Sequence, residues 1–200
     1  MKWTKIKIWL AKFFYPVAIW YWPKWSKIYR WLWQGEYKDV KLDENLSPVQ
    51  ANEKVRKLTW RADGAWALGD ACGSPHWVQY ALNKVVAGLP QPEGYLDCDD
   101  FSSWCVNVVD KKHDPRIFTF SWMSKDGKLA GHAMCLVRQK DGRVYHIGNW
   151  GLYGPYLNLR EACSVILTKK GSNEPIGWSL FTKNLKKIQC GRGLPPKTVI

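Results

Sequence analysis

The stretch LDCDDFSSWCVNVV, Leu96 to Val109, decides the fold class. It follows a segment, Gly88 to Tyr95, that holds two Pro and two Gly in eight residues and is therefore predicted to be a loop. From Cys98 onward, apolar residues recur at intervals of three or four, which predicts a helix with one apolar face. These residues are Phe101, Trp104, Cys105 and Val108. Such a helix needs a sheet or other helices to cover that face.

Downstream of this helix the hydrophobic pattern becomes that of strands. Four runs are rich in β-branched or aromatic residues: Arg116–Trp122, His132–Gln139, Val144–Asn149 and Val165–Leu167. Two of the breaks, Lys125–Lys128 and Lys140–Arg143, contain Asp-Gly, the strongest short-range hairpin signal. The runs therefore predict an antiparallel sheet.

Upstream, two further segments carry apolar residues at helical intervals, Val49–Trp60 and Pro75–Val86. Ser74 is a typical cap for the second of them, and Pro75 suits a first helical turn. Helices followed by an antiparallel sheet predict an α+β fold, with the Cys98 helix laid on the sheet.

The first thirty-three residues differ from the rest in composition. Met1 to Trp33 holds seven of the fourteen Trp and seven Lys or Arg, with no acidic residue. Before Pro16 the apolar positions lie at helical spacing, which predicts an amphipathic helix: Trp3, Ile6, Trp9, Leu10 and Phe13. The longest uncharged run of this segment, 13–23, has eleven residues, whereas a membrane-spanning helix needs about 20. Neither a membrane span nor a secretory signal is expected.

Three kinds of partner suit this amino-terminal arm. Trp and Tyr favour the membrane–water boundary and Lys attracts anionic headgroups, so the arm can lie on an anionic membrane surface. The aromatic stripe can instead pack on the rest of the chain or on a partner protein. Aromatic and basic residues can also stack on bases and neutralise phosphate. Nucleic acid is the least favoured partner, because no nucleic-acid-binding motif accompanies them.

Length and composition limit the organisation of the chain. Two hundred residues suit one domain with an appendage, and 46% hydrophobic with 24% charged residues exclude a disordered chain. The formal net charge is +13. We divide the sequence into the Trp/Lys-rich arm (1–33), a polar linker (34–50) and one domain (51–200). The cellular location is not evident from the sequence.

Among the six cysteines, Cys98 is distinguished by its position at a predicted helix start. Backbone N–H groups there carry roughly half a positive charge, which favours a thiolate and lowers the thiol pKa from about 8.5. The thiolate is a nucleophile. Cys105, two turns further along among apolar residues, is predicted to be a buried structural residue. No CxxC pair is present for zinc, and no metal or cofactor is expected.

Acyl transfer through a thiolate also requires an imidazole that moves the proton. Of the four histidines, His132 opens a predicted strand beside a turn, at a sheet edge where it can meet a thiolate on a facing helix. Asn149 ends the next strand, and Asp141-Gly142 lies about midway between these two positions. Antiparallel pairing therefore brings His132 and Asn149 together, and Asn149 is predicted to hold the ring.

The order Cys98, His132, Asn149, on helix, strand and strand, resembles the transglutaminase-like superfamily. A Gly/Pro loop followed by Asp-Cys-Asp-Asp-Phe, and later Gly-His-Ala opening a strand, is most similar to its bacterial and phage transglutaminase-like cysteine proteinases. The upstream stretches Leu58–Asp63 and Ser74–Trp77 also resemble that branch. The resemblance covers roughly residues 50–160, and Asn149 stands where the family usually has Asp.

The resemblance implies a papain/transglutaminase-like fold and a cysteine-dependent amide hydrolase, either a peptidase or a peptidoglycan amidase. Cys98 would be the nucleophile, His132 the base and Asn149 the orienting residue, with a thioester intermediate. The N–H of Cys98 and a second donor from Trp77 or Gln79 would stabilise the oxyanion. The substrate would be a protein or peptidoglycan, and the branch suggests a phage origin.

Two alternatives from other functional classes remain open. One is a catalytically inactive relative that serves as a structural or assembly protein. The other is a membrane-associated or nucleic-acid-binding protein in which the arm itself is the functional element.

Overall fold

A computed structural model describes residues 2–61, 71–149, 151–172 and 175–197. Ala62 and Asp63, part of one stretch that resembles the proteinase branch, lie outside these residues. The helical elements are α1 (Lys2–Trp33), η1 (Gly35–Tyr37), α2 (Pro48–Val55), α3 (Pro75–Val86), α4 (Cys98–Val108), η2 (Lys111–His113) and α5 (Leu159–Lys169). The strands are β1 (Arg116–Met123), β2 (Leu129–Arg138), β3 (Val144–Gly148), β4 (Gly151–Tyr156), β5 (Gly177–Phe181) and β6 (Lys187–Arg192).

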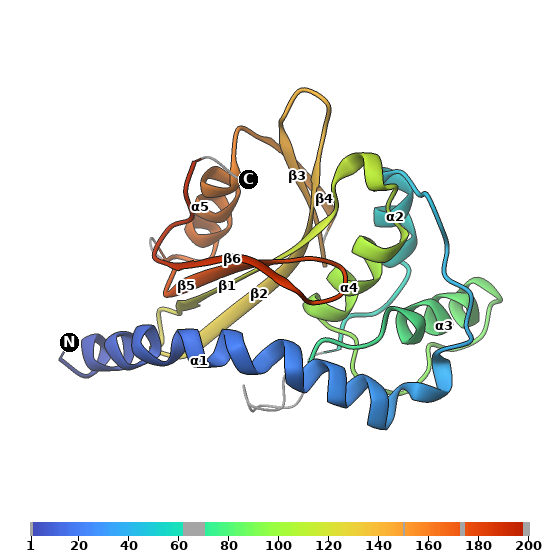
Figure 1. The fold of residues 1–200 in the computed structure, drawn as a ribbon, viewed down its shortest axis with the longest axis horizontal. Helices are drawn as coiled ribbons and strands as arrows, with labels where there is room; N and C mark the ends of the chain where they lie inside the picture. Colours follow the sequence, from blue (N-terminus) through green and yellow to red (C-terminus); the bar gives the residue numbers. More distant parts are fainter. Residues whose placement is uncertain (1, 62–70, 150, 173–174, 198–200) are drawn as a thin grey trace.

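The six strands form one sheet in the order β4-β3-β2-β1-β5-β6, and every neighbouring pair is antiparallel. The helices α2, α3 and α4 lie on one side of this sheet and α5 lies on the other, while α1 runs along one end of the molecule (Figure 1). The predicted α+β class is therefore confirmed. The two predicted Asp-Gly turns are present, and Gly127 (φ +72°) and Gly142 (φ +81°) adopt the left-handed conformation there.

Side-chain caps begin α3 and α4 where the sequence predicts. The hydroxyl of Ser74 accepts a hydrogen bond from the N–H of His76, and Pro75 occupies the first turn of α3. Asp97 caps α4 through a capping box with Asp100, so that Cys98 becomes its first residue. The position of the candidate nucleophile follows from this cap.

One predicted strand is wrong. Val165–Leu167 lies inside α5, which is capped by the side chain of Asn158. The buried residues of α5 recur at helical intervals and pack on the sheet, so tertiary burial overrides the local β-branched composition: they are Leu159, Ala162, Cys163, Ile166 and Leu167. Because α5 separates β4 from β5, the helices do not all precede the sheet.

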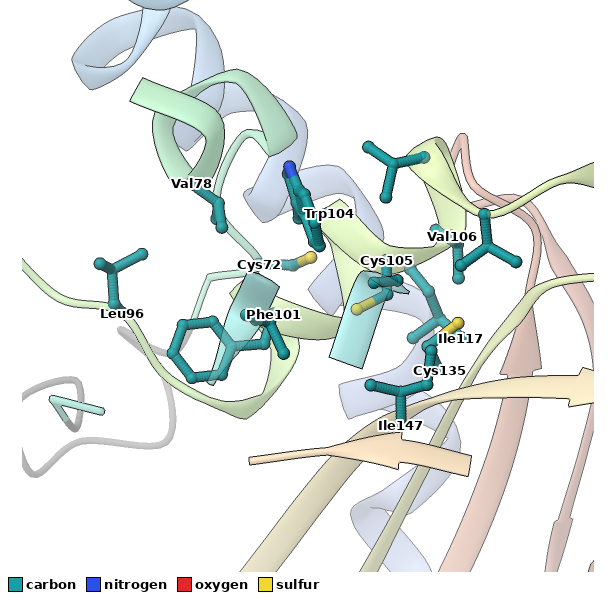
Figure 2. Packing of buried hydrophobic residues seen from close by; sticks show 14 of the residues in the cluster. Cys72, Val78, Leu96, Phe101, Trp104, Cys105, Val106, Ile117, Cys135 and Ile147 are labelled. Carbon is teal, nitrogen blue, oxygen red and sulfur yellow. The ribbon is translucent and has the colours of Figure 1, made fainter. Parts of the chain in front are cut away.

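Two hydrophobic cores occupy the two faces of the sheet. On one face, Phe101, Trp104 and Cys105 of α4 pack with Cys135 and other residues of the central strands (Figure 2). On the opposite face, Met134 and Leu136 of β2 pack with Leu159, Cys163 and Ile166 of α5. Alternate residues of β2 therefore belong to different cores, as strand geometry requires.

Helix α1 continues through Pro16 and Pro23 to Trp33, so the helix extends well beyond the predicted segment before Pro16. A proline inside a helix costs about 3 kcal/mol. Packing on the domain offsets this cost: Tyr15 donates to or accepts from the hydroxyl of Ser179 at 3.2 Å, and Trp22 lies 5.2 Å from the ring of Phe181.

Polar contacts attach the end of α1 to the domain. Arg30 donates from Nε to the backbone oxygen of Cys72 at 2.9 Å and from Nη2 to the hydroxyl of Ser103 at 2.9 Å. The hydroxyl of Ser26 accepts from the N–H of Cys72 at 3.0 Å, and the amide oxygen of Gln34 accepts from the N–H of Ser74. The second half of α1 is thus docked along one stripe.

Candidate active site

Cys98 lies at the point where α4 meets β2. Its side chain is half-buried, and its Sγ accepts a hydrogen bond from the backbone N–H of Ala133 at 3.4 Å. Ala133 is the residue directly after His132 in β2. The predicted approach of the Cys98 helix to the strand that carries His132 is therefore observed at the level of neighbouring residues, although this strand begins at Leu129 and not at His132.

The thiol lies beside a part of β2 that is not paired with β3 in the described residues, which forms a local edge inside the sheet. In the described residues the pairing of β2 with β3 begins at Cys135↔Ile147 and continues to Arg138↔Val144. In a strand, backbone N–H groups two residues apart point to the same side. The N–H groups of Ala133 and Cys135 therefore point to the same side of β2. At Ala133 this N–H donates to Cys98 instead of to a neighbouring strand. Cys98 thus lies where the ladder between β2 and β3 would continue.

His132 reaches this edge from the opposite face. Strand alternation places its side chain with Met134 and Leu136, on the α5 side, and its ring meets Phe120 edge-to-face at 6.1 Å. The expected arrangement, an imidazole pointing directly at the facing helix, is therefore not what the strand geometry produces. The thiol of Cys98 contacts β2 at Ala133, and the imidazole of His132 lies on the α5 face of the same strand.

Asn149 lies at the same edge, directly after β3. Continuing the observed register by two residues places Asn149 opposite Ala133. A Cβ added to Gly148 would lie 3.6 Å from Nε2 of His132, so the ring lies against the backbone next to Asn149. The Oδ1 of Asn149 is buried and has no hydrogen-bond partner among the residues that the structure describes. This acceptor is available for an N–H donor.

The electrostatic surroundings keep the imidazole of His132 neutral. His132 is only 8% exposed, and burial lowers its pKa to about 4; the charge of Lys170 acts in the same direction, and the carboxylate of Asp97 opposes both. A neutral imidazole is the form that accepts a proton from a thiol. His132 is thus in the base form at any pH well above 4.

Three buried carboxylates surround the start of α4. Oxygens of Asp97, Asp99 and Asp100 lie within 4.8 Å of one another. Asp100 accepts hydrogen bonds from the N–H groups of Asp97 and Gly73, and Asp97 accepts from the N–H of Asp99. Asp100 therefore serves local hydrogen bonds at the start of α4. Negative charge here opposes a thiolate on Cys98 and offsets part of the stabilisation from the helix start.

Cys98 differs from the buried cysteines in its surroundings. Burial raises the pKa of Cys72 to about 11, that of Cys163 to about 12, and those of Cys105 and Cys135 well above the ordinary range. The prediction that Cys105 is buried is confirmed. None of the six cysteines forms a disulfide, and besides Cys98 only Cys190 has appreciable exposure.

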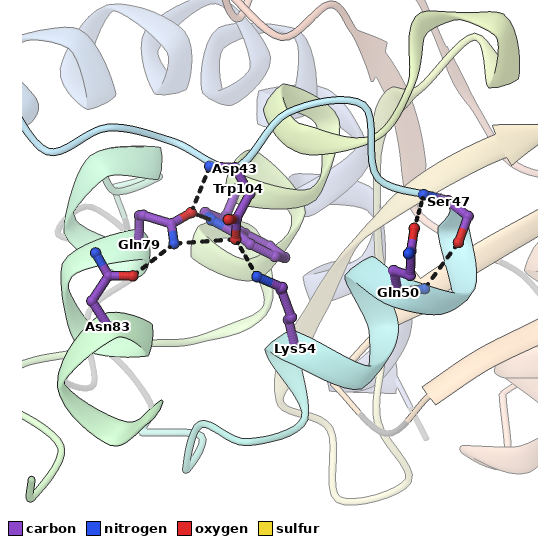
Figure 3. Close-up of polar contacts among 7 residues, drawn as sticks. All are labelled: Asp43, Ser47, Gln50, Lys54, Gln79, Asn83 and Trp104. Atoms are coloured by element: carbon purple, nitrogen blue, oxygen red, sulfur yellow. Dashed lines mark hydrogen bonds and ion pairs between the residues drawn. The ribbon is translucent and has the colours of Figure 1, made fainter. Parts of the chain in front are cut away.

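The two predicted oxyanion donors have other partners. The indole N–H of Trp77 donates to the backbone oxygen of Tyr95 at 3.1 Å. The side-chain amide of Gln79 donates to Asp43 and Asn83, and its oxygen accepts from the indole of Trp104 at 2.9 Å (Figure 3). Both side chains therefore hold α3 to its neighbours, and neither is available to stabilise an oxyanion.

A cavity of about 190 Å³ adjoins His132, and the sequence did not indicate it. It lies between β2, β3, β4 and α5, and its lining includes His132, His146, Tyr153, Tyr156, Lys169 and Lys170. Alternation along β3 could have placed His146 on the face of Val144. The cavity as a whole could not be predicted, because it requires α5, and the sequence predicts a strand for part of this helix.

The chain was compared with known families, curated proteins and solved structures, and none of these matches it.

Proposed function

We propose that this protein is a cysteine-dependent amide hydrolase, a peptidase or a peptidoglycan amidase, with the fold and reaction type of transglutaminase-like cysteine proteinases. The observation that carries the proposal is the convergence at one sheet edge of three residues that are distant in the sequence. Cys98 contacts the backbone at Ala133, His132 precedes that residue, and Asn149 directly follows β3, whose register with β2 extrapolates to the same position. Cys98 at a helix start and His132 in a strand support the resemblance.

In the proposed reaction, the sulfur of Cys98 forms a bond to the carbonyl carbon while its proton passes to His132. The carbon–nitrogen bond then breaks, and the leaving amine takes the proton from the imidazolium, which leaves a thioester. Water attacks the thioester and its proton passes to His132; the carbon–sulfur bond then breaks, and the sulfur of Cys98 takes that proton from the imidazolium. The backbone N–H of Cys98, at the start of α4, is the proposed oxyanion donor.

The thiol and imidazole must meet around the edge of β2. The edge permits this because the pairing with β3 in the described residues begins only at Cys135. Asn149 would accept the N–H of His132 at Nε2, since that nitrogen lies near Gly148 and the Oδ1 of Asn149 is buried. An amide oxygen in this position orients a neutral ring without adding charge.

The test is whether the full chain hydrolyses amide bonds in a mixture of denatured proteins and, in a separate assay, in purified peptidoglycan. The release of new amino groups measures the hydrolysis. We expect turnover with the wild type and none with Cys98→Ala, while the matched variant Cys190→Ala retains full activity. Equal turnover by Cys98→Ala and the wild type, or no hydrolysis of either polymer, would overturn the proposal. Incorporation of a fluorescent primary amine would show that an amine and not water resolves the thioester.

A second candidate function is attachment to an anionic membrane through the arm, residues 1–33. The face of α1 opposite the docked stripe exposes apolar residues at steps of three and four: Ile6, Leu10, Phe13, Val17 and Trp20, with Trp9 and Trp31 beside them. The other described helices and strands lie on one side of α1 in Figure 1. Within the described part of the chain, no helix has the length and apolar character needed to cross a bilayer.

The charge of the arm favours an anionic membrane over a second copy of this chain as its partner. The arm carries seven cationic and no acidic residues, so two arms would repel each other, whereas anionic headgroups would attract them. Flotation with vesicles containing phosphatidylglycerol should recover the protein, and vesicles of phosphatidylcholine alone should not. The triple variant Trp9→Ala, Phe13→Ala, Trp20→Ala should lose at least tenfold in vesicle binding.

The matched control for flotation replaces three exposed apolar residues outside α1: Trp60→Ala, Leu89→Ala and Leu157→Ala. This control should float like the wild type. Failure of the wild type to float, or a stable dimer in size-exclusion chromatography that the arm variant abolishes, would contradict the membrane role.

A further inference from the structure

The cavity behind His132 contains a buried polar atom without a partner. His146 is only 4% exposed, lines the cavity, and has an Nδ1 for which the described chain provides no hydrogen-bond partner. Its ring stacks between Tyr153 at 5.2 Å and Tyr156 at 5.6 Å. A buried nitrogen that is left without a hydrogen bond destabilises the folded state, so a ligand that bonds to it recovers that energy.

The charges around the cavity select an anion. Lys169 and Lys170 lie on its rim at the end of α5, and the described residues that line it include no carboxylate. Each positive charge reaches an imidazole: Lys170 lowers the pKa of His132, and Lys169 that of His146, although burial is the larger cause for both. Such a site repels metal cations and attracts a negatively charged group.

The walls and size further restrict the ligand. Val165 and Ile166 of α5 contribute apolar surface, and the tyrosine rings form a second wall. A water molecule needs on the order of 10–15 Å³ of such space, so a cavity of about 190 Å³ holds a group several atoms long. A short aliphatic chain that ends in a carboxylate matches both the walls and the charged rim.

We propose that this cavity binds a carboxylate on a short aliphatic chain, as in a glutamate-like side chain of the substrate, with Nδ1 of His146 and the two lysines as its partners. Its use as a substrate pocket rests on the proposed hydrolase function, because His132 belongs to both sites. The binding itself does not require catalysis. A protonated His146 donates from Nδ1 to the carboxylate, so bound anion stabilises the imidazolium form.

The test is NMR of the imidazole resonances of the full chain during titration with butyrate, and with butyramide as a neutral ligand of the same shape. At pH 6, where butyrate is ionised, butyrate should produce a saturable shift of the His146 imidazole resonances, and butyramide should not. The groups that face His146 and set this response are His132, Tyr153, Tyr156, Lys169 and Lys170. His113, in η2, provides an internal reference.

The double variant Lys169→Gln, Lys170→Gln should weaken butyrate binding at least tenfold, and the matched variant Lys183→Gln, Lys186→Gln should bind as the wild type does. No shift with butyrate, equal shifts with both ligands, or unchanged binding by the first variant would overturn the proposal. If butyrate binds but Cys98 is alkylated no faster than Cys190, the result supports the anion site and contradicts the hydrolase. If Cys98 is alkylated faster than Cys190 but butyrate does not bind, the result supports the hydrolase and contradicts the anion site.

Discussion

The backbone N–H of Ala133 donates to the Sγ of Cys98 at 3.4 Å, so strand backbone holds the candidate nucleophile in place. The donor is a backbone group, so the contact does not depend on a side chain of β2. Substitution of the neighbouring His132 therefore leaves the contact of the thiol with β2 intact. The variant His132→Ala consequently tests the chemistry of the imidazole with little change in the position of the sulfur.

Asn149 is predicted to position His132 in the proposed reaction. Asn149→Ala removes the buried Oδ1 acceptor and should lower kcat by roughly tenfold to a hundredfold, with a smaller change in KM, because a misoriented base acts on the chemical step. Asn149→Asp restores the acceptor and should recover much of the activity. The measurement is the kcat and KM of each variant on one peptide substrate. Equal loss in both variants would contradict a positioning role.

The two buried histidines predict a loss of stability in acid. Burial lowers the pKa of His132 to about 4 and that of His146 to about 3, below an unfolded value of about 6.5. The unfolded chain therefore binds more protons between pH 6.5 and these values, and the free energy of unfolding falls as the pH drops through that window. For one such group the loss from pH 7 to pH 4 is on the order of 3 kcal/mol.

Urea unfolding at pH 7 and pH 4 measures this acid loss. The variant His146→Gln should show a difference between the two pH values that is smaller by about 3 kcal/mol. The matched variant His113→Gln, in the η2 turn, should retain the wild-type difference. An unchanged pH dependence in His146→Gln would show that this histidine is not buried in its neutral form.

Gln79 is predicted to stabilise the fold and to take no part in catalysis. Gln79→Leu leaves the buried indole N–H of Trp104 and the backbone N–H of Asp43 without their acceptor (Figure 3). The expected loss is about 2 kcal/mol in the free energy of unfolding, with kcat unchanged in the folded fraction. Asn83→Ala, which removes only one partner of Gln79, should cost less than half of this. A loss of kcat without a loss of stability would instead support a role for Gln79 in the oxyanion hole.

Arg30 is predicted to attach α1 to the domain. Arg30→Met leaves the backbone oxygen of Cys72 and the hydroxyl of Ser103 without a cationic donor, and should cost about 2–3 kcal/mol. Arg143→Met, which breaks an exposed ion pair with Asp141, should cost less than about 1 kcal/mol. Thermal unfolding of both variants measures the difference. Equal small losses would mean that α1 is not held by this contact.

The parts of the fold that local signals specify could be predicted from the sequence. Ser74-Pro75 and the Asp97 cap begin α3 and α4 at the expected residues, and the Asp-Gly turns produce the expected hairpins. The pairing of β5 with β1 is a long-range contact with no local signal. In α5, the run Val165–Leu167 favours a strand locally, and only burial against the sheet selects the helix.

The same division applies to the candidate site. The hairpin around Asp141-Gly142 predicts that His132 and Asn149 approach, and the register supports this. Alternation along β2 places His132 on the face of Met134 and Leu136, but which face of the sheet α4 covers depends on tertiary packing, which the sequence does not indicate. Likewise, Trp77 and Gln79 precede the nucleophile as expected, but their bonds to Tyr95 and Trp104 depend on tertiary packing.

The most direct test of the central claim is the rate at which iodoacetamide alkylates Cys98 at pH 6, measured by peptide mass spectrometry on the folded chain with the exposed Cys190 as internal reference. An adjacent base and the start of α4 should make Cys98 react at least tenfold faster than Cys190. His132→Ala should abolish that advantage, and His113→Ala should retain it. Alkylation of Cys98 no faster than that of Cys190, or equally fast in His132→Ala, would contradict the account.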